Sequence, residues 1–155
     1  MKTARLVVAA VLALACVSLV WGRASKSMVG EKLPPLNLQY LKGKPDIAGK
    51  PLILEFWATW CPPCRKSIPH LNDLYNKHKS KGLVVIGVSN EKRDVVEKFL
   101  KTTRMDYYPA VDANLAKTFG VTGIPHAVLV DKTGKIVWEG HPAQISEKEL
   151  ALILD

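Results

Sequence analysis

The sequence predicts an α/β fold with a central mixed β-sheet and helices on both faces. Short apolar runs bounded by turn residues, such as Leu52 to Phe56 and Leu83 to Val88, alternate along the chain with amphipathic helical patterns. Near the C-terminus, two apolar runs flank the turn sequence Lys132-Thr133-Gly134-Lys135, which predicts an antiparallel hairpin. Strands that alternate with helices and end in a hairpin imply both parallel and antiparallel pairs.

The N-terminal segment, residues 1–24, has the composition of a targeting signal. Lys2 and Arg5 precede an apolar run from Leu6 to Val20, and Gly22-Arg23-Ala24 offers small residues to a signal peptidase. We expect a cleaved signal peptide or an uncleaved membrane anchor. Lipidation of Cys16, which lies inside the apolar run, is a third alternative. Each route exports the following domain, so we expect a periplasmic or otherwise extracytoplasmic protein, soluble or tethered to the membrane.

A polar linker at residues 25–32 is expected to precede one domain spanning residues 33–155. Leu33 to Tyr40 contains two prolines and then alternates apolar and polar residues, which predicts an edge strand. A long helix should run from Pro62 to about Lys81, where Gly82 offers a natural stop.

The second half of the domain should alternate strands with shorter helices. An amphipathic pattern marks one of these helices, and a capping box marks the start of the last one. In order we expect a strand at Leu83–Val88, a helix at Asp94–Thr103, a strand at Tyr107–Val111, a helix at Asn114–Phe119, strands at Pro125–Asp131 and Ile136–Glu139, and a helix from Ser146 to near Asp155.

Cys61 and Cys64 stand at the start of the long predicted helix, directly after a strand. A helix N-terminus carries partial positive charge and free N–H groups, which stabilise a thiolate, the reactive form of cysteine. We predict that Cys61 is an exposed nucleophile with a lowered pKa and that Cys64, one turn further, is the resolving thiol. Pro62 and Pro63 remove two backbone donors, so the amide support for the thiolate is reduced.

The stretch Trp60-Cys61-Pro62-Pro63-Cys64 resembles the active site of the thioredoxin superfamily, and most closely its exported TlpA/ResA-type branch. The interval of 61 residues from Cys64 to Pro125 is long for a plain thioredoxin, and the helix–strand insert that it implies resembles that of the TlpA/ResA type and also that of the peroxiredoxin branch. The resemblance covers residues 33–155, and three further matches support it: Glu55 six residues before Cys61, where thioredoxins place a buried acid, Pro69 eight residues after Cys61, and Phe119–Pro125, which is similar to the segment ending in their cis-proline.

The resemblance implies roles for individual residues. Glu55, desolvated within its strand, should have a raised pKa and accept the proton of Cys64 when a mixed disulfide is resolved. Pro125 should be cis and face the dithiol. The backbone of Ile124 should bind an extended substrate peptide, and Trp60 should cover the dithiol. Cys61 and Cys64 would then form the redox-active disulfide.

Two positions depart from the resembled family and weaken a specific role in cytochrome c maturation. ResA-like proteins resemble one another in having an acid three residues after the second cysteine, where this chain has Ser67. Members dedicated to cytochrome c often carry Glu after the cis-proline, where this chain has His126. Thiol exchange itself depends on neither position.

We therefore predict an exported thiol–disulfide oxidoreductase that reduces disulfides in partner proteins and acts as a monomer, with no cofactor and no metal site. A membrane-bound electron donor would restore the dithiol, and cytochrome c or metalloprotein maturation is one possible role. Residues 1–24 contribute three of the eight net positive charges, which leaves a modestly basic domain of +5. No nucleic-acid motif accompanies this charge, so we expect no nucleic-acid partner.

Three alternatives stay open at this point. A thiol peroxidase of the redoxin type would need Pro and Thr or Ser at seven and three residues before the reactive cysteine, where the chain has Leu54 and Ala58. A disulfide-forming oxidant would use the same residues at a different reduction potential. A non-enzymatic metal-carrier module tends to use a C-x-x-x-C spacing plus a histidine, whereas the spacing here is C-x-x-C.

Overall fold

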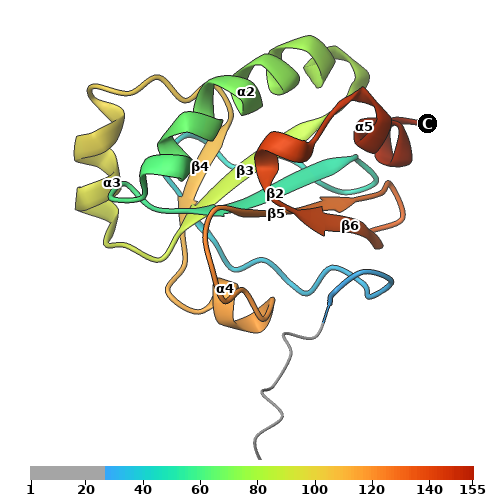
Figure 1. The fold of residues 1–155 in the computed structure, drawn as a ribbon, viewed down its shortest axis with the longest axis horizontal. Coiled ribbons are helices and arrows are strands. Elements are labelled where there is room, and N and C mark those ends of the chain that lie inside the picture. Colours follow the sequence, from blue (N-terminus) through green and yellow to red (C-terminus); the bar gives the residue numbers. More distant parts are fainter. Residues whose placement is uncertain (1–26) are drawn as a thin grey trace, which may run out of the picture.

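Within residues 27–155, which the computed structural model describes, six strands form one sheet in the order β1-β4-β3-β2-β5-β6 (Figure 1). β3 is parallel to both β2 and β4, whereas β5 pairs antiparallel with β2, β6 with β5, and β1 with β4. This arrangement confirms the predicted mixed sheet. The strands are β1 (Gln39–Tyr40), β2 (Leu52–Trp57), β3 (Val84–Ser89), β4 (Tyr108–Val111), β5 (His126–Val130) and β6 (Ile136–Gly140).

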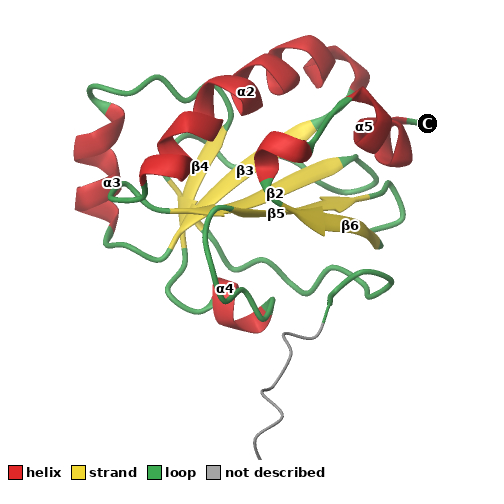
Figure 2. Cartoon of the chain, in the orientation of Figure 1, coloured by secondary structure: helices red, strands yellow, loops and turns green. Residues whose placement is uncertain are grey.

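Helices cover both faces of the sheet (Figure 1, Figure 2). One face carries an apolar core to which α2, α3 and α5 contribute, and the other carries a core to which α4 and the chain before β2 contribute. Single 3₁₀ turns follow α2 at Lys79–Lys81 and precede α5 at Pro142–Gln144. The helices are α2 (Pro62–His78), α3 (Arg93–Leu100), α4 (Leu115–Thr118) and α5 (Glu147–Leu154).

Strand β2 lies between β3 and β5 and is buried along its whole length. Its side chains alternate between the two cores, as the pleat of a strand requires. Ile53 and Trp57 belong to the core on the α2 side, and Leu54 and Phe56 belong to the core on the α4 side. Glu55 falls between Ile53 and Trp57 in this alternation. Its carboxyl group therefore points into the layer between the sheet and α2.

Helix α2 begins immediately after a short turn that leaves β2. Cys61 is its N-cap, and Pro62 takes the first helical position, where a missing N–H group costs no hydrogen bond. The α-helix ends at His78, a few residues before the predicted end, and the 3₁₀ turn carries the chain to Gly82. Gly82 has a φ of 91°, in the left-handed region, which confirms the predicted stop.

Strand β1 is shorter than the sequence predicted. The expected strand ran from Leu33 to Tyr40, but β1 contains Gln39 and Tyr40 alone. The two prolines after Leu33 lack the N–H groups that a strand ladder needs. The N–H of Leu33 donates instead to the carbonyl oxygen of Gly134 at 2.8 Å. The other predicted elements differ from the observed bounds by a few residues at most.

Part of the segment predicted as a linker packs against the hairpin of β5 and β6. The N–H of Gly30 donates to the carbonyl of Ile136 at 2.8 Å, and the N–H of Ile136 donates to the carbonyl of Glu31 at 2.9 Å. Contacts of the domain therefore begin before residue 33. The predicted targeting segment, residues 1–24, lies outside the described residues. In the described part, from residue 27 onward, no helix has the length and apolar character needed to cross a membrane.

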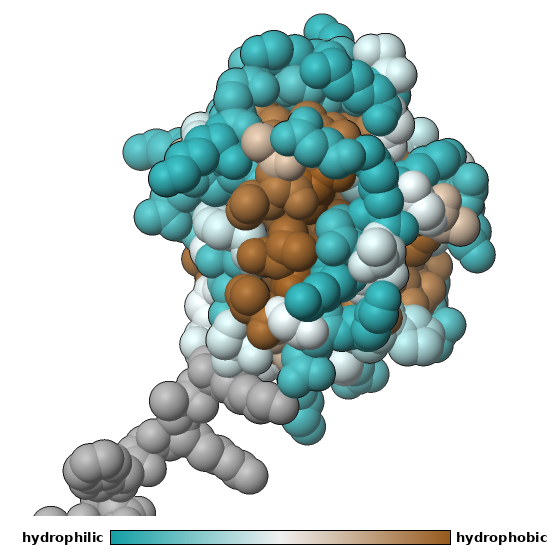
Figure 3. Space-filling model, turned by 90° about the vertical axis from the view of Figure 1, so that its right-hand side faces the viewer, coloured by the Kyte–Doolittle hydropathy of each residue, from teal (hydrophilic) through white to brown (hydrophobic). Residues whose placement is uncertain are grey.

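The side of the molecule near α5 and β6 exposes a band of apolar residues within a hydrophilic surround (Figure 3). Across the whole described surface, large apolar side chains are exposed at scattered positions rather than in one element. They are Val29, Trp60, Val95 and Leu152. Single exposed side chains such as these four are normal for a folded domain, whereas a continuous band is a different feature.

Replacing Gly82 with alanine should lower the free energy of unfolding by about 1–2 kcal/mol, because a side chain disfavours left-handed backbone. Urea denaturation of Gly82→Ala and of the unmodified protein measures this difference. Gly123→Ala is the matched control, since a Cβ at either position meets no atom within 4 Å but Gly123 is not left-handed. Equal losses in the two variants would show that backbone conformation at Gly82 is not the cause.

Candidate active site

A disulfide joins Cys61 and Cys64 across the first turn of α2. The two Cα atoms are 5.3 Å apart, an ordinary separation for a disulfide. The N–H of Cys64 donates to Cys61 Sγ at 3.3 Å, so the sulfur acts as the cap of the helix. In the reduced protein the same N–H group and the helix dipole would stabilise a thiolate on Cys61.

Cys61 is more buried than the sequence predicted. We expected an exposed nucleophile, but only 2% of Cys61 is exposed in this oxidised structure, and Cys64 is fully buried. Both cysteines belong to the core between the sheet and α2, and Ile124 packs against that core. The carbonyl oxygen of Ile124 lies 3.9 Å from Cys61 Sγ. The prediction was wrong because a loop distant in sequence covers the sulfur.

The loop that covers Cys61 contains a cis peptide bond between Ile124 and Pro125, as the resemblance implied. Strand β5 begins at the next residue, and His126 pairs with Phe56 near the end of β2. This register brings the loop to the end of β2 from which the chain turns toward α2. Ile124 and Pro125, predicted as substrate-binding residues, therefore lie beside the disulfide.

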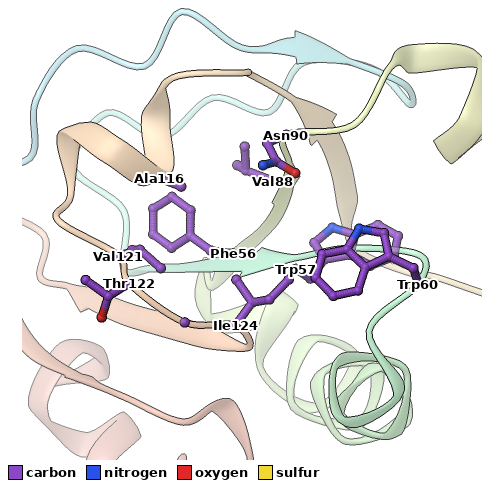
Figure 4. Close-up of a pocket in the computed structure, with 10 residues that line it drawn as sticks. Phe56, Trp57, Trp60, Val88, Asn90, Ala116, Val121, Thr122 and Ile124 are labelled. Atoms are coloured by element: carbon purple, nitrogen blue, oxygen red, sulfur yellow. The ribbon is translucent and has the colours of Figure 1, made fainter.

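A mainly apolar groove of about 370 Å³ is lined in part by Trp60, which precedes Cys61, and by Ile124, whose carbonyl oxygen approaches Cys61 Sγ (Figure 4). Trp57 and Trp60 form one end of the groove and Val121 and Thr122 the other. The Trp60 side chain, predicted to cover the dithiol, is 68% exposed and forms a wall of the groove, while the Ile124 loop lies over Cys61. The remaining lining residues are Phe56, Val88, Asn90, Ala116, Gly123 and Ile124.

Glu55 is fully buried, in agreement with the prediction of a buried acid. Its Oε2 accepts a hydrogen bond from the hydroxyl of Tyr107 at 3.0 Å, and its buried Oε1 has no hydrogen-bond partner among the described residues. Desolvation raises the pKa of Glu55 to about 8, and the hydrogen bond from Tyr107 opposes part of that rise. A carboxyl group with this pKa exchanges protons near neutral pH, unlike an exposed glutamate.

Glu91 anchors the turn that leads from β2 to Cys61. Its two carboxylate oxygens accept hydrogen bonds from the N–H and the hydroxyl of Thr59, both at 2.7 Å. The hydroxyl of Ser89 adds a third bond at 3.0 Å. Sequence reasoning missed this anchor, because Thr59 and Glu91 are 32 residues apart. Only the register of β2 with β3, which sets Trp57 opposite Ser89, reveals it.

The two positions that depart from the resembled family have ordinary surroundings. Ser67 is buried, and its hydroxyl donates to the carbonyl of Pro63 at 3.2 Å within α2. His126 is partly buried; burial lowers its pKa, and the charge of Glu139 opposes that shift. Among residues 27–155, no group of three or more His, Cys, Asp or Glu side chains comes together in a way that could hold a metal ion.

Comparison with known proteins agrees with this fold and site. The model of a family described as the AhpC/TSA family matches residues 29–139. The thiol-disulfide oxidoreductase ResA of Bacillus cereus is 34% identical over 135 residues, which cover 83% of this chain and 78% of that protein.

Solved structures agree as well. A Chlorobium tepidum protein assigned as a thiol:disulfide interchange protein DsbE aligns with a TM-score of 0.76 at 30% identity, covering 84% of this chain and 100% of that one. StoA from Bacillus subtilis aligns with a TM-score of 0.58 at 28% identity, covering 67% of this chain and 84% of that one.

Fold and site together define a thioredoxin-like thiol-disulfide protein. The chain belongs to the AhpC/TSA family, and its relatives include ResA thiol-disulfide oxidoreductases. Its activity is therefore that of a protein thiol–disulfide oxidoreductase, which confirms the predicted enzyme class.

The buried carboxyl group should make stability depend on pH. The pKa of Glu55 rises from 4.5 to about 8 on folding, so between these values the folded state binds more protons than the unfolded state. Its contribution to stability is thus fully present below about pH 4.5 and is lost as the pH rises through 8. Between pH 5 and pH 8, this residue should lower the free energy of unfolding by roughly 3 kcal/mol.

Glu55→Gln removes this titration and keeps an oxygen that can accept the bond from Tyr107. Urea denaturation of the oxidised protein at pH 5 and pH 8 should therefore show a pH dependence weaker by roughly 3 kcal/mol in the variant. Glu97→Gln serves as the control, because Glu97 is an exposed glutamate paired with Arg93 on α3. A full pH dependence that persists in Glu55→Gln would contradict a raised pKa.

Proposed function

We propose that this protein reduces disulfide bonds in proteins outside the cytoplasm by cycling Cys61 and Cys64 between dithiol and disulfide. The observation that carries the proposal is the disulfide at the start of α2, beside a cis-proline loop and an apolar groove. Reduction by thiol exchange needs a nucleophile, a second thiol, a proton acceptor and a surface for the partner. The described residues offer a candidate for each.

In the proposed cycle, the Cys61 thiolate attacks one sulfur of a substrate disulfide. A bond forms between the two sulfurs, and the other substrate sulfur leaves as a thiolate. Cys64 then passes its proton to Glu55 and attacks Cys61 Sγ, which releases the second substrate sulfur as a thiolate. Glu55 and solvent return protons to the two product thiolates. The substrate gains two electrons, and the protein ends as the Cys61–Cys64 disulfide.

Glu55 suits the role of proton acceptor because of its place in the fold. It lies on the face of β2 that packs against α2, and Cys64 is part of the same core. With a pKa of about 8, a minor but useful fraction of the carboxyl is ionised at pH 7. When Cys64 gives its proton to this ionised carboxylate, Glu55 becomes neutral, and burial stabilises the neutral form. Glu55 is therefore a suitable base for the deprotonation of Cys64.

Substrate proteins would bind across the cis-proline loop and the groove. An extended peptide would bond to the backbone of Ile124 beside Pro125, with its cysteine sulfur directed at Cys61. Apolar side chains next to that cysteine would enter the groove between Trp60 and Val121. Apolar recognition suits partly folded proteins, because their apolar residues are still accessible to a partner.

The proposed location depends on residues 1–24, which have the basic start and apolar run of a targeting signal. Outside the cytoplasm the surroundings oxidise thiols, so a membrane-bound donor would have to supply electrons to the dithiol. The resemblance to the TlpA/ResA branch favours a narrower role in the maturation of cytochrome c or other metalloproteins, whereas Ser67 and His126, which depart from that branch, weaken the cytochrome c role. We expect the protein to act as a monomer.

The main alternative, a disulfide-forming oxidant, would use the same residues with electrons flowing the other way. Pro62 and Pro63 favour the reductant, since they remove two N–H donors that would otherwise stabilise the thiolate of the reduced form. A peroxidase is less well supported. Leu54, at the position of the redoxin proline, belongs to the core on the opposite face of the sheet from Cys61.

The reduction potential of the Cys61–Cys64 pair separates the reductant from the oxidant. The protein would be equilibrated with defined ratios of reduced and oxidised glutathione or dithiothreitol, and its free thiols alkylated and counted by mass spectrometry. A value near that of thioredoxin, about −270 mV, is expected. A value near −120 mV would make the protein an oxidant instead. Cys61→Ser, which cannot form the disulfide, should show no two-electron transition.

A further inference from the structure

Tyr107 is the residue that hydrogen-bonds the Glu55 carboxyl group within the described part of the chain, and it comes from a distant segment. It immediately precedes β4, at the end of the connection from α3, and it is buried as deeply as Glu55. Its hydroxyl donates to Glu55 Oε2 at 3.0 Å, across 52 residues of sequence. The connection from α3 to β4 thus places the Tyr107 hydroxyl in the protein interior beside Glu55.

Tyr107 reaches Glu55 by crossing an intervening strand. The sheet order is β4-β3-β2, and neighbouring strands lie about 4.8 Å apart, so a side chain from the start of β4 must pass over β3. At the crossing, β3 has Gly87, directly opposite Glu55 in the register. A Cβ atom at Gly87 would lie 3.1 Å from Tyr107 Cε2 and 3.1 Å from Trp57 Nε1. Glycine at this position therefore provides the space that the tyrosine ring occupies.

The hydroxyl of Tyr107 hydrogen-bonds one oxygen of the Glu55 carboxyl group and leaves the other oxygen without a partner. Glu55 Oε1 is buried and has no hydrogen-bond partner among residues 27–155. The strands on either side of Glu55 contribute Gly87 and Ala127 opposite it, neither of which ionises. From α2, Cys64 belongs to the same core. The unpaired oxygen of Glu55 and the resolving thiol of Cys64 therefore share the layer between the sheet and α2.

We propose that Tyr107 is a positioning residue, which anchors Glu55 Oε2, leaves Oε1 for the proton of Cys64, and favours the ionised carboxyl that accepts this proton. The inference rests on the proposed thiol exchange. A hydrogen bond donated to a carboxylate stabilises its charged form, whereas burial stabilises the neutral form. Without the hydroxyl, burial acts unopposed. Glu55 then keeps its proton throughout the neutral range, and Cys64 loses its acceptor.

The reaction of the reduced protein with 5,5′-dithiobis(2-nitrobenzoate) isolates the step that involves Glu55. In the first phase, Cys61 attacks the reagent, forms a mixed disulfide and releases one thionitrobenzoate. In the second phase, Cys64 loses its proton, attacks Cys61 Sγ and releases the second thionitrobenzoate. Each release is coloured, so stopped-flow absorbance from pH 5 to pH 10 gives both rates. Only the second rate depends on the deprotonation of Cys64.

In Tyr107→Phe, the pH midpoint of the second phase should rise by about one to two units, and its rate at pH 7 should fall at least tenfold. The first phase should be unchanged. Tyr108→Phe is the matched control, because the neighbouring ring of Tyr108 packs edge-on against Tyr75, 6.0 Å between centroids, and should leave both phases unchanged. A merely structural role of Tyr107 would alter stability without moving the midpoint.

A double-mutant cycle with Glu55→Gln completes the test. If Tyr107 acts through Glu55, Tyr107→Phe should have no further effect on the second phase once Glu55 is Gln. A midpoint unchanged in Tyr107→Phe, or an equal rate loss with and without Glu55, would overturn the role of Tyr107 and leave the exchange function standing. Absence of the first phase in the unmodified protein would instead overturn the exchange function itself.

Discussion

A carboxyl group buried in the central strand is the constraint on which the rest of this structure depends. Ionising Glu55 in place costs about 5 kcal/mol relative to the unfolded chain, from a pKa that rises from 4.5 to about 8. An apolar residue, like its neighbours Ile53 and Trp57 on the same face, would avoid this cost. The fold accommodates the carboxyl because Tyr107 satisfies one of its oxygens and Gly87 leaves space for the tyrosine ring.

The buried carboxyl group of Glu55 and the disulfide lie close together in the chain, near the end of β2. β2 ends at Trp57, and the turn anchored by Glu91 leads directly to the disulfide at the start of α2. β5 begins beside the same end of β2, so the loop with Pro125 lies over Cys61. One continuous segment, from Glu55 to Cys64, supplies the acid and the sulfurs, and a segment distant in sequence supplies the covering loop. The groove between Trp60 and Val121 has Ile124 of that loop in its lining.

Features encoded by local spacing could be predicted from the sequence, and features that depend on strand register could not. The cysteine pair at a helix start followed from local spacing, whereas the buried acid and the cis-proline were implied by the resemblance to the thioredoxin superfamily, each through residues within one short segment. Tyr107 reaches Glu55 across Gly87 only because β4, β3 and β2 are neighbours in the sheet. The residues around Tyr107 and around Gly87 do not reveal this order. The expectation of an exposed Cys61 failed for the same reason, since Ile124 covers it from 63 residues away.

The most direct measurement is the titration of the Glu55 carboxyl carbon by ¹³C NMR in the oxidised protein. Labelling glutamate at the side-chain carboxyl, and comparing spectra with those of Glu55→Gln, would assign the resonance. A midpoint near pH 8 is expected, well separated from exposed glutamates near pH 4.5. A midpoint near pH 4.5 would show that the carboxyl is not desolvated, and Glu55 would lose its place as the proton acceptor of Cys64.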